Sequence, residues 1–528
     1  MQPVSQAWLN NQKMPVVSKG YLRIELYVSN NDIYLPETTI TGAQTDATYS
    51  NYENIIKEEK VVKPQSFLGL NQFVLDGNTD IIEANTEGVY SAYLSRYNGA
   101  LTTFSVTITL PYETSNKTRS IQLQFDENRG YAVDFKVTFR KPVSGGWLII
   151  HRETITNNTE SVVNLNFEDI VGYSEIVIEV SKWSLPFQKA FISYIFLGFV
   201  KTFTEKDIIS YTAKNSIDLT NGNLPTDEIN FEIDNTEGVF DSDPNNTSSK
   251  NIYGFLSTRQ KIVVSYGYKF NNLTEWIKGG TVYLSEWNCP QNGITASFTA
   301  KNILSFLSMN FVKNNNDTLT YKNLAIAVFN ASGVVKYNLQ DSKLSGTINA
   351  SINNVTCAEV LQQIAQATSS ILYCDRDGTI RIEAIPSVIY GNYNIDLENC
   401  YKYPEIYLEE EVKNLTVWFY AYSQTSSGGD VIETITKTST TYSNYYQGNE
   451  MEINNPLVKD VYDYSNYFNI KNRRINYSCV LRIDPRVELL DIVTLTSKNN
   501  DTSYVIVTGT TIDYNGAFSG KVEVKIWQ

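Results

Sequence analysis

The chain has 528 residues, of which 42% are hydrophobic and 19% are charged, so it can build buried cores and is not a charge-rich disordered chain. At roughly 100–200 residues per domain, this length predicts about three or four domains. The 43 basic and 57 acidic residues give a net charge of −14, which disfavours the negative backbone of nucleic acid as a main partner. There is no apolar run of about 18 residues to span a membrane. The N-terminus also lacks the pattern of a signal peptide, so we expect folding in the cytoplasm.

Cysteine and histidine are too sparse for the common disulfide and metal arrangements. The single histidine, His151, lies in an apolar run typical of a strand, and we interpret it as a strand residue. The cysteine count is odd and contains no Cys-X-X-Cys pair, so we expect no disulfide framework, no metal site and no cofactor. The five cysteines are Cys289, Cys357, Cys374, Cys400 and Cys479.

Alternating apolar residues predict strands through the first two hundred residues. Ile24, Leu26 and Val28 share one face of the first such segment. A dense series of strands follows within residues 66–198, separated by turn signals and without helical stretches, which indicates an antiparallel sandwich. Its predicted strands lie at 106–110, 121–125, 133–139, 176–180 and 191–196.

The segment 199–312 is predicted to be a sheet that ends in a short helix. Ile303, Leu304 and Leu307 have helical spacing. The predicted strands of this segment lie at 201–203, 208–211, 228–233, 262–266, 281–284 and 295–300.

Residues 353–385 predict a helix followed by a hairpin. Thr356 and Glu359 have the spacing of a capping box, and apolar residues then recur at helical spacing to Thr368. The Asp377-Gly378 pair between two alternating runs is a hairpin signal.

The C-terminal part is predicted to be mainly strands with one further helix. Asn455-Pro456 places proline at a first helical position, and Leu457, Val461, Tyr464 and Phe468 would line one face of that helix. In the last strand, Val522, Val524 and Ile526 should face inward, and Lys521, Glu523 and Lys525 outward. Its other predicted strands lie at 415–420, 432–437, 476–483, 492–496 and 504–508.

No constellation of residues carries recognisable chemistry, so we predict no catalytic residues and no enzyme activity. The acidic cluster Asp234, Glu237, Asp241 and Asp243 lacks the spacing of a calcium loop, and Gly238 is better explained as a turn residue. Carboxylate pairs for glycoside hydrolysis stay open, because no spacing singles one out. Trp183 is a speculative exposed platform for a sugar ring, against the alternative that it packs in the core.

Several motifs, in order, resemble the tail hub proteins of bacteriophages from Gram-positive hosts and of related contractile bacteriocin-like devices. The chain departs from the family pattern in places: Asn302 stands where the family usually has Asp, Leu490 where it usually has Gly, and Gln and Lys replace parts of the pattern in Leu256–Gly267. The matching segments are Asn223–Asp241, Leu256–Gly267, Gly280–Trp287, Gly293–Leu307, the 357–378 helix and hairpin, Asn455–Leu457, Arg482–Val493 and Tyr514–Gly520.

The predicted sandwich resembles the galactose-binding-like jelly roll often inserted in these hubs. Its strands at 121–125 and 131–139, the segment Lys182–Phe187 and the segment 192–198 match in order. The resemblance implies a mostly β, multidomain tail-hub fold with minor α content, built of tube-like β domains with the inserted jelly roll. The expected domains are 1–65 and 199–312 (first hub domain), 66–198 (jelly roll), 313–394 (helix-hairpin domain) and 395–528 (C-terminal tube-like domain).

The resemblance further implies a structural baseplate or tail-tip protein of the virion, assembled in the host cytoplasm. Its copies would form a ring, commonly a homotrimer, that continues the tail tube. The expected partners are the tail tube, distal tail proteins, a spike or tape-measure protein and, as a candidate, host surface glycans. Two alternatives stay open: a carbohydrate-binding adhesin that acts through the sandwich, and a wall-degrading enzyme, against which we expect no lytic domain after the hub-like end.

Overall fold

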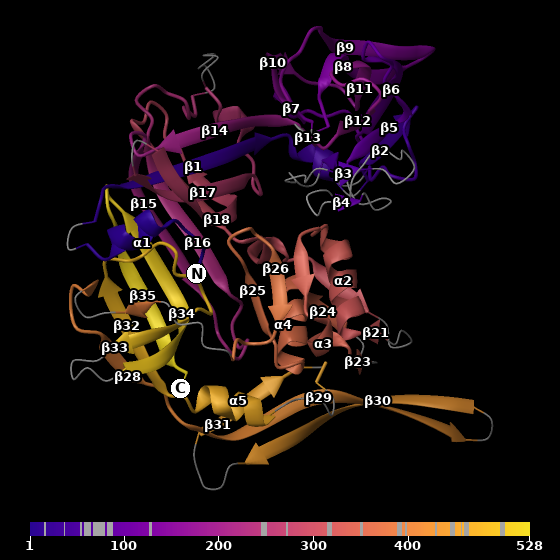
Figure 1. Ribbon diagram of the computed structural model, residues 1–528. Helices are drawn as coiled ribbons and strands as arrows, with labels where there is room; N and C mark the ends of the chain where they lie inside the picture. Colours follow the sequence, from indigo (N-terminus) through magenta and orange to yellow (C-terminus); the bar gives the residue numbers. More distant parts are fainter. Residues whose placement is uncertain are drawn as a thin grey trace. The chain divides into compact units, whose positions relative to one another are not determined.

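The structure is a computed structural model of the full chain (Figure 1). It describes all residues except 15–16, 36, 53–54, 57–64, 67–79, 82–87, 126–128, 244–250, 271–272, 314–318, 349–351, 388–392, 396–398, 428–429, 444–448, 456, 459–463, 497–501 and 528. The chain divides into two compact units, one of residues 1–25, 202–251 and 261–528, the other of residues 26–201 and 252–260.

The fold is mostly β with minor α, as the sequence predicts. Its largest sheet places strands from the first and last parts of the chain side by side. In spatial order these are β14 (Gly198–Thr204), β1 (Gly20–Ser29), β17 (Lys261–Phe270), β18 (Leu273–Asn288), β19 (Thr295–Lys301), β16 (Thr226–Asp234), β15 (Ile208–Ser216), β34 (Thr502–Tyr514), β35 (Phe518–Ile526), β32 (Ile475–Leu481) and β28 (Glu405–Leu408). β33 (Ile492–Thr496) also pairs with β34, and β27 (Asn394–Ile395) pairs with β33.

The second unit is an antiparallel sandwich, and its strands confirm those predicted at 106–110, 121–125, 133–139 and 176–180. Its five-stranded sheet runs β2 (Thr39–Ala43), β6 (Ala100–Thr109), β11 (Glu175–Trp183), β8 (Ala132–Val143), β9 (Gly146–Ile155). Its three-stranded sheet runs β10 (Val162–Ile170), β7 (Thr118–Gln124), β13 (Tyr194–Phe196), and β12 (Lys189–Ile192) pairs with β5 (Val89–Leu94). Since β2 pairs with β6 and Ile33 and Ile55 are buried in the sandwich core, residues upstream of the expected boundary at 66 also contribute.

The helix-hairpin region forms as its local signals predict. α4 (Cys357–Ala367) begins with the complete Thr356–Glu359 capping box, and its apolar face is buried against α2 (Tyr321–Ser332). β25 (Ile371–Cys374) and β26 (Ile380–Glu383) form the predicted hairpin around Gly378, which has φ +76°. β22 (Tyr337–Leu339) joins this sheet in parallel, and α3 (Asp341–Leu344), β20 (Asn310–Lys313), β24 (Ile352–Thr356), β21 (Leu319–Thr320) and β23 (Thr347–Ile348) complete the region.

The remaining elements extend from this core and from the N-terminus. Long strands β29 (Val412–Ser427) and β30 (Asp430–Ser443) pair with each other, and β31 (Asn449–Asn454) joins β29. The others are α1 (Gln6–Gln12), α5 (Tyr464–Lys471), the pair β3 (Gln65–Ser66) and β4 (Asp80–Ile81), and the 3-10 turns η1 (Asn31–Tyr34), η4 (Tyr253–Phe255) and η5 (Ile303–Phe306). Within the described residues no helix is long and apolar enough to cross a membrane.

Predictions for two segments need correction, and one for the residue Lys525 follows below. The run 191–196 is not one strand, because it divides between β12 and β13, which belong to different sheets. The helix predicted from Asn455 is described only as α5, while Pro456 and Val461 lie outside the described residues. Leu457 and Phe468 are nevertheless buried with α2 and α4.

Lys525 was expected to face solvent but is only 6% exposed. Its Nζ lies 2.6 Å from Glu409 Oε2, which compensates the charge of the buried ammonium. The partner is 116 residues away, so the alternation of the last strand could not reveal it.

Leu490, at the position where the resembled family has glycine, keeps the left-handed backbone that glycine favours, with φ +67°. Its side chain is 6% exposed and packs with Ile492, Ile506 and Trp527. The turn therefore forms in spite of leucine, because burial of the side chain offsets a strain of about 1–2 kcal/mol.

We predict that Leu490→Ala destabilises the protein more than Leu490→Gly, by about 1 kcal/mol, because alanine loses the buried contacts and keeps the strain whereas glycine relieves it. Urea unfolding of both variants measures the difference. The matched pair Leu481→Ala and Leu481→Gly, in strand β32, should show the usual opposite order. An equal or larger loss for Leu490→Gly would contradict the explanation.

Candidate functional site

The two halves of the large sheet are joined by strands that lie far apart in sequence. β15 pairs with β34 in antiparallel register from Tyr211↔Tyr514 to Ser216↔Gly509. Tyr211 also shares a buried hydrogen bond of 2.8 Å with the hydroxyl of Tyr266 on β17. The early and late strands are therefore paired in one continuous sheet.

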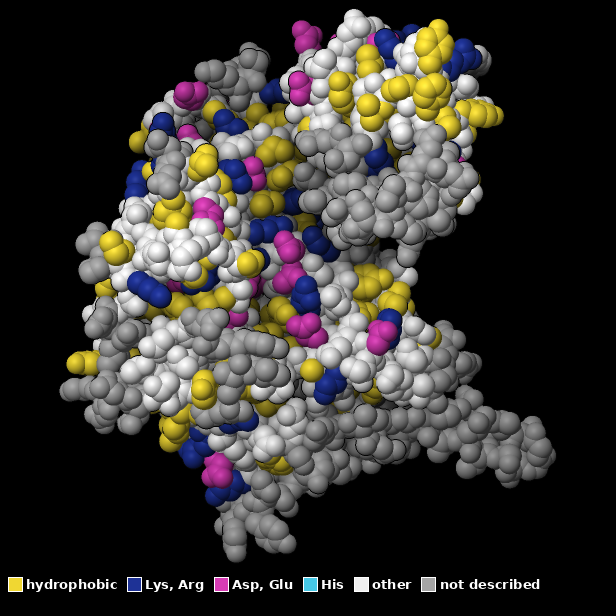
Figure 2. Space-filling model, in the orientation of Figure 1, with side chains coloured by type: hydrophobic (Ala, Val, Ile, Leu, Met, Phe, Trp, Pro, Cys, Tyr) yellow, Lys and Arg dark blue, Asp and Glu magenta, His cyan; other side chains and the backbone are white. Residues whose placement is uncertain are grey.

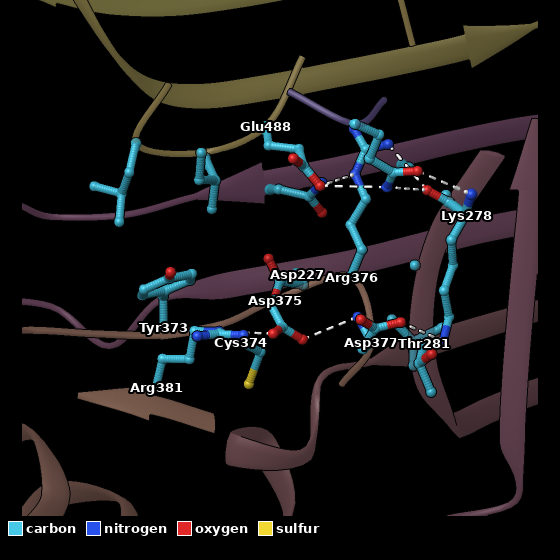
Figure 3. Close-up of a pocket in the computed structure, with 18 of the residues that line it drawn as sticks. Asp227, Lys278, Thr281, Tyr373, Cys374, Asp375, Arg376, Asp377, Arg381 and Glu488 are labelled. Atoms are coloured by element: carbon cyan, nitrogen blue, oxygen red, sulfur yellow. Dashed lines mark hydrogen bonds and ion pairs between the residues drawn. The ribbon is translucent and has the colours of Figure 1, made fainter. Parts of the chain in front are cut away.

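Arg376, at the tip of the β25–β26 hairpin, ties the helix-hairpin region to both halves of this sheet (Figure 3). Its Nη1 donates to the carbonyl oxygens of Lys278 at 3.0 Å and Pro485 at 2.8 Å, and its Nη2 donates to that of Val487 at 2.6 Å. Nε lies 3.4 Å from a carboxylate oxygen of Glu488, and the side chain is only 11% exposed. One planar guanidinium thus satisfies three backbone acceptors through a rigid fork of donors, a geometry that a lysine ammonium lacks.

Two further ion pairs hold the same hairpin. Lys278 Nζ contacts Asp377 Oδ1 at 2.8 Å, and Arg381 Nε contacts Asp375 Oδ2 at 2.7 Å. The hydrogen bond from Lys278 lowers the pKa of Asp377 below its ordinary value, so the carboxylate is ionised at neutral pH. These charges fix the turn in place beside Arg376.

A cleft of about 520 Å³ lies beside this junction, and Figure 3 shows the side chains around it. Asp227, at the start of β16, lines the cleft and accepts a hydrogen bond of 2.9 Å from Asn302 Nδ2. Burial raises the pKa of Asp227 to about 6, and the bond from Asn302 opposes this shift only in part. Asn302 is 1% exposed, and because it carries an amide in place of a carboxylate, two carboxylates do not face each other here.

Trp183 is not the exposed sugar platform considered from the sequence. Its side chain is 1% exposed, its Nε1 donates to the carbonyl oxygen of Arg129 at 2.7 Å, and its ring meets Phe125 edge to face. The packing alternative is therefore correct. His151 lies on β9, as expected of a strand residue, and its ring packs against those of Phe139 and Phe167.

The acidic cluster near Asp241 serves a turn. Gly238 has φ +66°, and Asp241 Oδ1 accepts bonds from the backbone N–H of Asp243 and of Asn292. In the described part of the chain, no three His, Cys, Asp or Glu side chains are arranged to hold a metal ion. All five cysteines are free thiols.

The sandwich presents exposed apolar side chains at the end of β5 and on two adjacent loops, which we call the aromatic patch: Tyr93, Leu94, Tyr97, Leu185 and Phe187. Ser95 holds the loops together, since its backbone exchanges hydrogen bonds with Phe187 and Gln188. Tyr97 is 80% exposed, and Phe187 is held in the left-handed region with φ +58°. Strain at an exposed aromatic residue is a feature of ligand-binding loops.

The large sheet ends at β28, whose four residues are all exposed. Ile406 and Leu408 lie opposite Tyr477 and Ile475 of β32 and are 65% and 61% exposed. The same face is fully buried one strand further in, at Val524. The apolar layer of the sheet therefore continues to an edge that nothing covers in the described chain. Tyr401, Tyr403 and Tyr407 add further exposed rings beside it.

Comparison with known proteins gives likeness in structure only. No family model and no curated protein matches the chain. It is similar to a 43 kDa tail protein of prophage MuSo2 from Shewanella oneidensis, with 10% identity and a TM-score of 0.40 over 61% of this chain and 95% of that one. It is also similar to a prophage tail protein from Listeria monocytogenes, with 10% identity and a TM-score of 0.35 over 62% and 91%.

A smaller likeness concerns a family 32 carbohydrate-binding module from C. perfringens, solved with galactose. It has 14% identity and a TM-score of 0.20 over 34% of this chain and 99% of that one. Scores of this size do not establish a common fold.

We predict that Arg376→Ala lowers the free energy of unfolding by about 2–4 kcal/mol, because three carbonyls and Glu488 lose a shared partner. Arg376→Lys should recover only part of the loss, because an ammonium lacks the planar fork. Thermal unfolding and limited proteolysis near residue 376 measure both. The exposed pair Lys322–Asp341 provides the control, since Lys322→Ala should cost below about 0.5 kcal/mol. A similarly small cost for Arg376→Ala would show that the junction does not depend on this residue.

Asp227 should make the folded state less stable as pH rises. Its folded pKa of about 6 exceeds the ordinary 3.8, so the stabilising protonated form is present below pH 4 and is lost as pH rises through 6. The difference amounts to at most ~3 kcal/mol. We predict that Asp227→Asn, which keeps an acceptor for Asn302, raises stability at pH 7 and removes this part of the pH dependence. Urea unfolding at pH 4 and pH 7 tests it, with Asp234→Asn on the same strand as control. An unchanged pH profile in Asp227→Asn would refute the assignment.

Proposed function

We propose that this chain is a structural hub of a phage tail tip, whose copies join into a ring that continues the tail tube. The family resemblance of the sequence motifs supports this proposal. The role uses shape and interfaces and requires no nucleophile, cofactor or metal. A net charge of −14 suits a wall past which DNA moves without binding.

The observation that carries the proposal is the unfinished sheet edge at β28. An exposed, apolar edge strand offers unpaired backbone groups to another chain, and monomeric proteins normally cover or charge such edges. Here Ile406 and Leu408 continue the buried layer of the sheet into solvent. A second copy that adds a strand at this edge would bury both side chains and satisfy the backbone.

The chain already makes a junction of this kind within itself. β15 and β34 come from distant parts of the sequence and join two groups of strands edge to edge. Repetition of edge pairing between copies generates a closed ring when the rotation between neighbours closes. We propose three copies in the ring. Distal tail proteins and a spike or receptor-binding component are the proposed partners at its two faces.

A second candidate function is carbohydrate binding by the sandwich. The aromatic patch favours it, since Tyr97 and Phe187 present rings on loops fixed through Ser95. Flat aromatic faces are suited to the apolar faces of sugar rings. In this reading the sandwich is an adhesin carried by the hub, and Trp183 acts only as a core residue.

The ring proposal predicts that the full chain, alone or with tail partners, has a native mass of three monomers at micromolar concentration. The double variant Ile406→Asn, Leu408→Asn should shift it to monomer, because polar side chains weaken the apolar contact at the edge. Val312→Asn is the matched control, since Val312 is 62% exposed on β20 and should leave the mass unchanged. A strictly monomeric wild type, even with tail partners present, would contradict the proposal.

A further inference from the structure

The end of the β8–β9 hairpin extends beyond the sheet that supports it. β11 pairs with β8 only as far as Arg140, so the last residues of β8 have β9 as their sole strand neighbour in the described structure. Residues 142–149 are all exposed. Ser144 and Gly145 form the turn, and Gly145 has φ +92°. The hairpin end is therefore a free-standing projection of the sandwich.

This projection is apolar on both of its faces. Val143, Trp147, Leu148 and Ile149 are 45%, 46%, 47% and 42% exposed. Because successive strand residues point to opposite faces, Leu148 lies on one face and Trp147 and Ile149 lie on the other. A groove on a protein partner covers one face of a strand well. A surrounding apolar medium covers both, so the two-sided pattern favours a lipid surface.

Cations stand at the base of the projection. The guanidinium of Arg140 lies 4.0 Å from the ring centre of Trp147, and Lys141 is the next residue. Between residues 140 and 149 there is no acidic residue. Glu175 pairs with Arg140 and Glu113 pairs with Lys141, at 2.9 Å each, and the exposed Lys141–Glu113 pair is the weaker of the two. The apolar tip is thus the main element, and the charges add a preference for anionic headgroups.

The dimensions suit insertion at a membrane interface. Strand residues rise by roughly 3.3 Å each, so the turn lies about 10–13 Å from the cationic base. Interfacial protein segments are buried to about 5–10 Å at the headgroup and acyl boundary. Tryptophan and arginine side chains are amphipathic and suited to the level of the headgroups. Figure 2 shows hydrophobic side chains with Lys and Arg beside them in the region where Figure 1 has β8 and β9.

We propose that the tip of the β8–β9 hairpin binds the surface of a bilayer that contains anionic lipids, with Trp147 and Leu148 inserted at the interface. This activity goes beyond the proposed hub role and does not depend on it. A tail protein with such a hairpin would contact the membrane directly when the tail tip reaches it.

The test is sedimentation of the full chain with vesicles of phosphatidylglycerol and phosphatidylcholine, compared with vesicles of phosphatidylcholine alone. We expect binding to the anionic vesicles that weakens as salt is raised. The double variant Trp147→Ala, Leu148→Asn should partition about tenfold more weakly, because two exposed apolar groups are lost without change to the core. Lys141→Gln should weaken binding to anionic vesicles by about fivefold. Tyr97→Ala, an exposed aromatic of the same sandwich, is the control and should bind as wild type.

A second readout places the tryptophan. Brominated lipid should quench part of the protein fluorescence in the wild type, and Trp147→Phe should lose that part while still binding. Failure of the wild type to bind anionic vesicles, or equal binding by the double variant, would overturn the proposal. A change in native mass of the double variant without any vesicle binding would instead assign the hairpin to a protein interface and would equally overturn it.

Discussion

The structure depends on how the backbone groups of its edge strands find hydrogen-bond partners. Every backbone N–H and C=O along an edge strand needs a partner, and water is a poor substitute when the adjoining side chains are apolar. The chain meets this requirement at one place by joining β15 to β34, strands that lie about 300 residues apart in sequence, in a register that runs from Tyr211↔Tyr514 to Ser216↔Gly509. At β28 the outer edge has no partner strand in the described chain. The apolar layer that is buried at Val524 continues from there to the exposed Ile406. The proposed ring follows from that contrast.

The second constraint is the rigid attachment of the helix-hairpin region. Arg376 bonds carbonyls on both sides of the β15–β34 join, at Lys278 and at Pro485 and Val487. A charged group with so little exposure is stable only when its donors are satisfied, and here three backbone acceptors and Glu488 do this. The structural role that we propose would depend on fixed junctions of this kind.

Much of the fold could be predicted from short sequence motifs. Features that depend on contacts between residues far apart in sequence could not. The helix at 357–367 and the hairpin at Gly378 depend on neighbours within a few residues, so the capping box and the Asp-Gly turn were sufficient. Lys525 was misjudged as exposed because its partner, Glu409, lies 116 residues away in sequence. For Trp183 the sequence left exposure and packing open, because its acceptor, the carbonyl of Arg129, lies 54 residues away. From the sequence, Arg376 could be recognised only as a residue of the hairpin turn. Its role depends on three carbonyls about 100 residues away on either side, which no periodicity reports. The β28 edge was missed for the same reason, because a four-residue strand carries too little pattern.

Hydrogen exchange at β28 tests the central claim most directly. In the described part of the chain residues 406–408 pair with β32 alone, and the amides of Ile406 and Leu408 face the open edge. If copies pair there, peptides that contain these residues should become protected as protein concentration rises into the range where the chain assembles, while peptides from β20, which already pairs with β24, should not change. Rapid exchange of the β28 amides at every concentration, and in the presence of tail partners, would contradict the account.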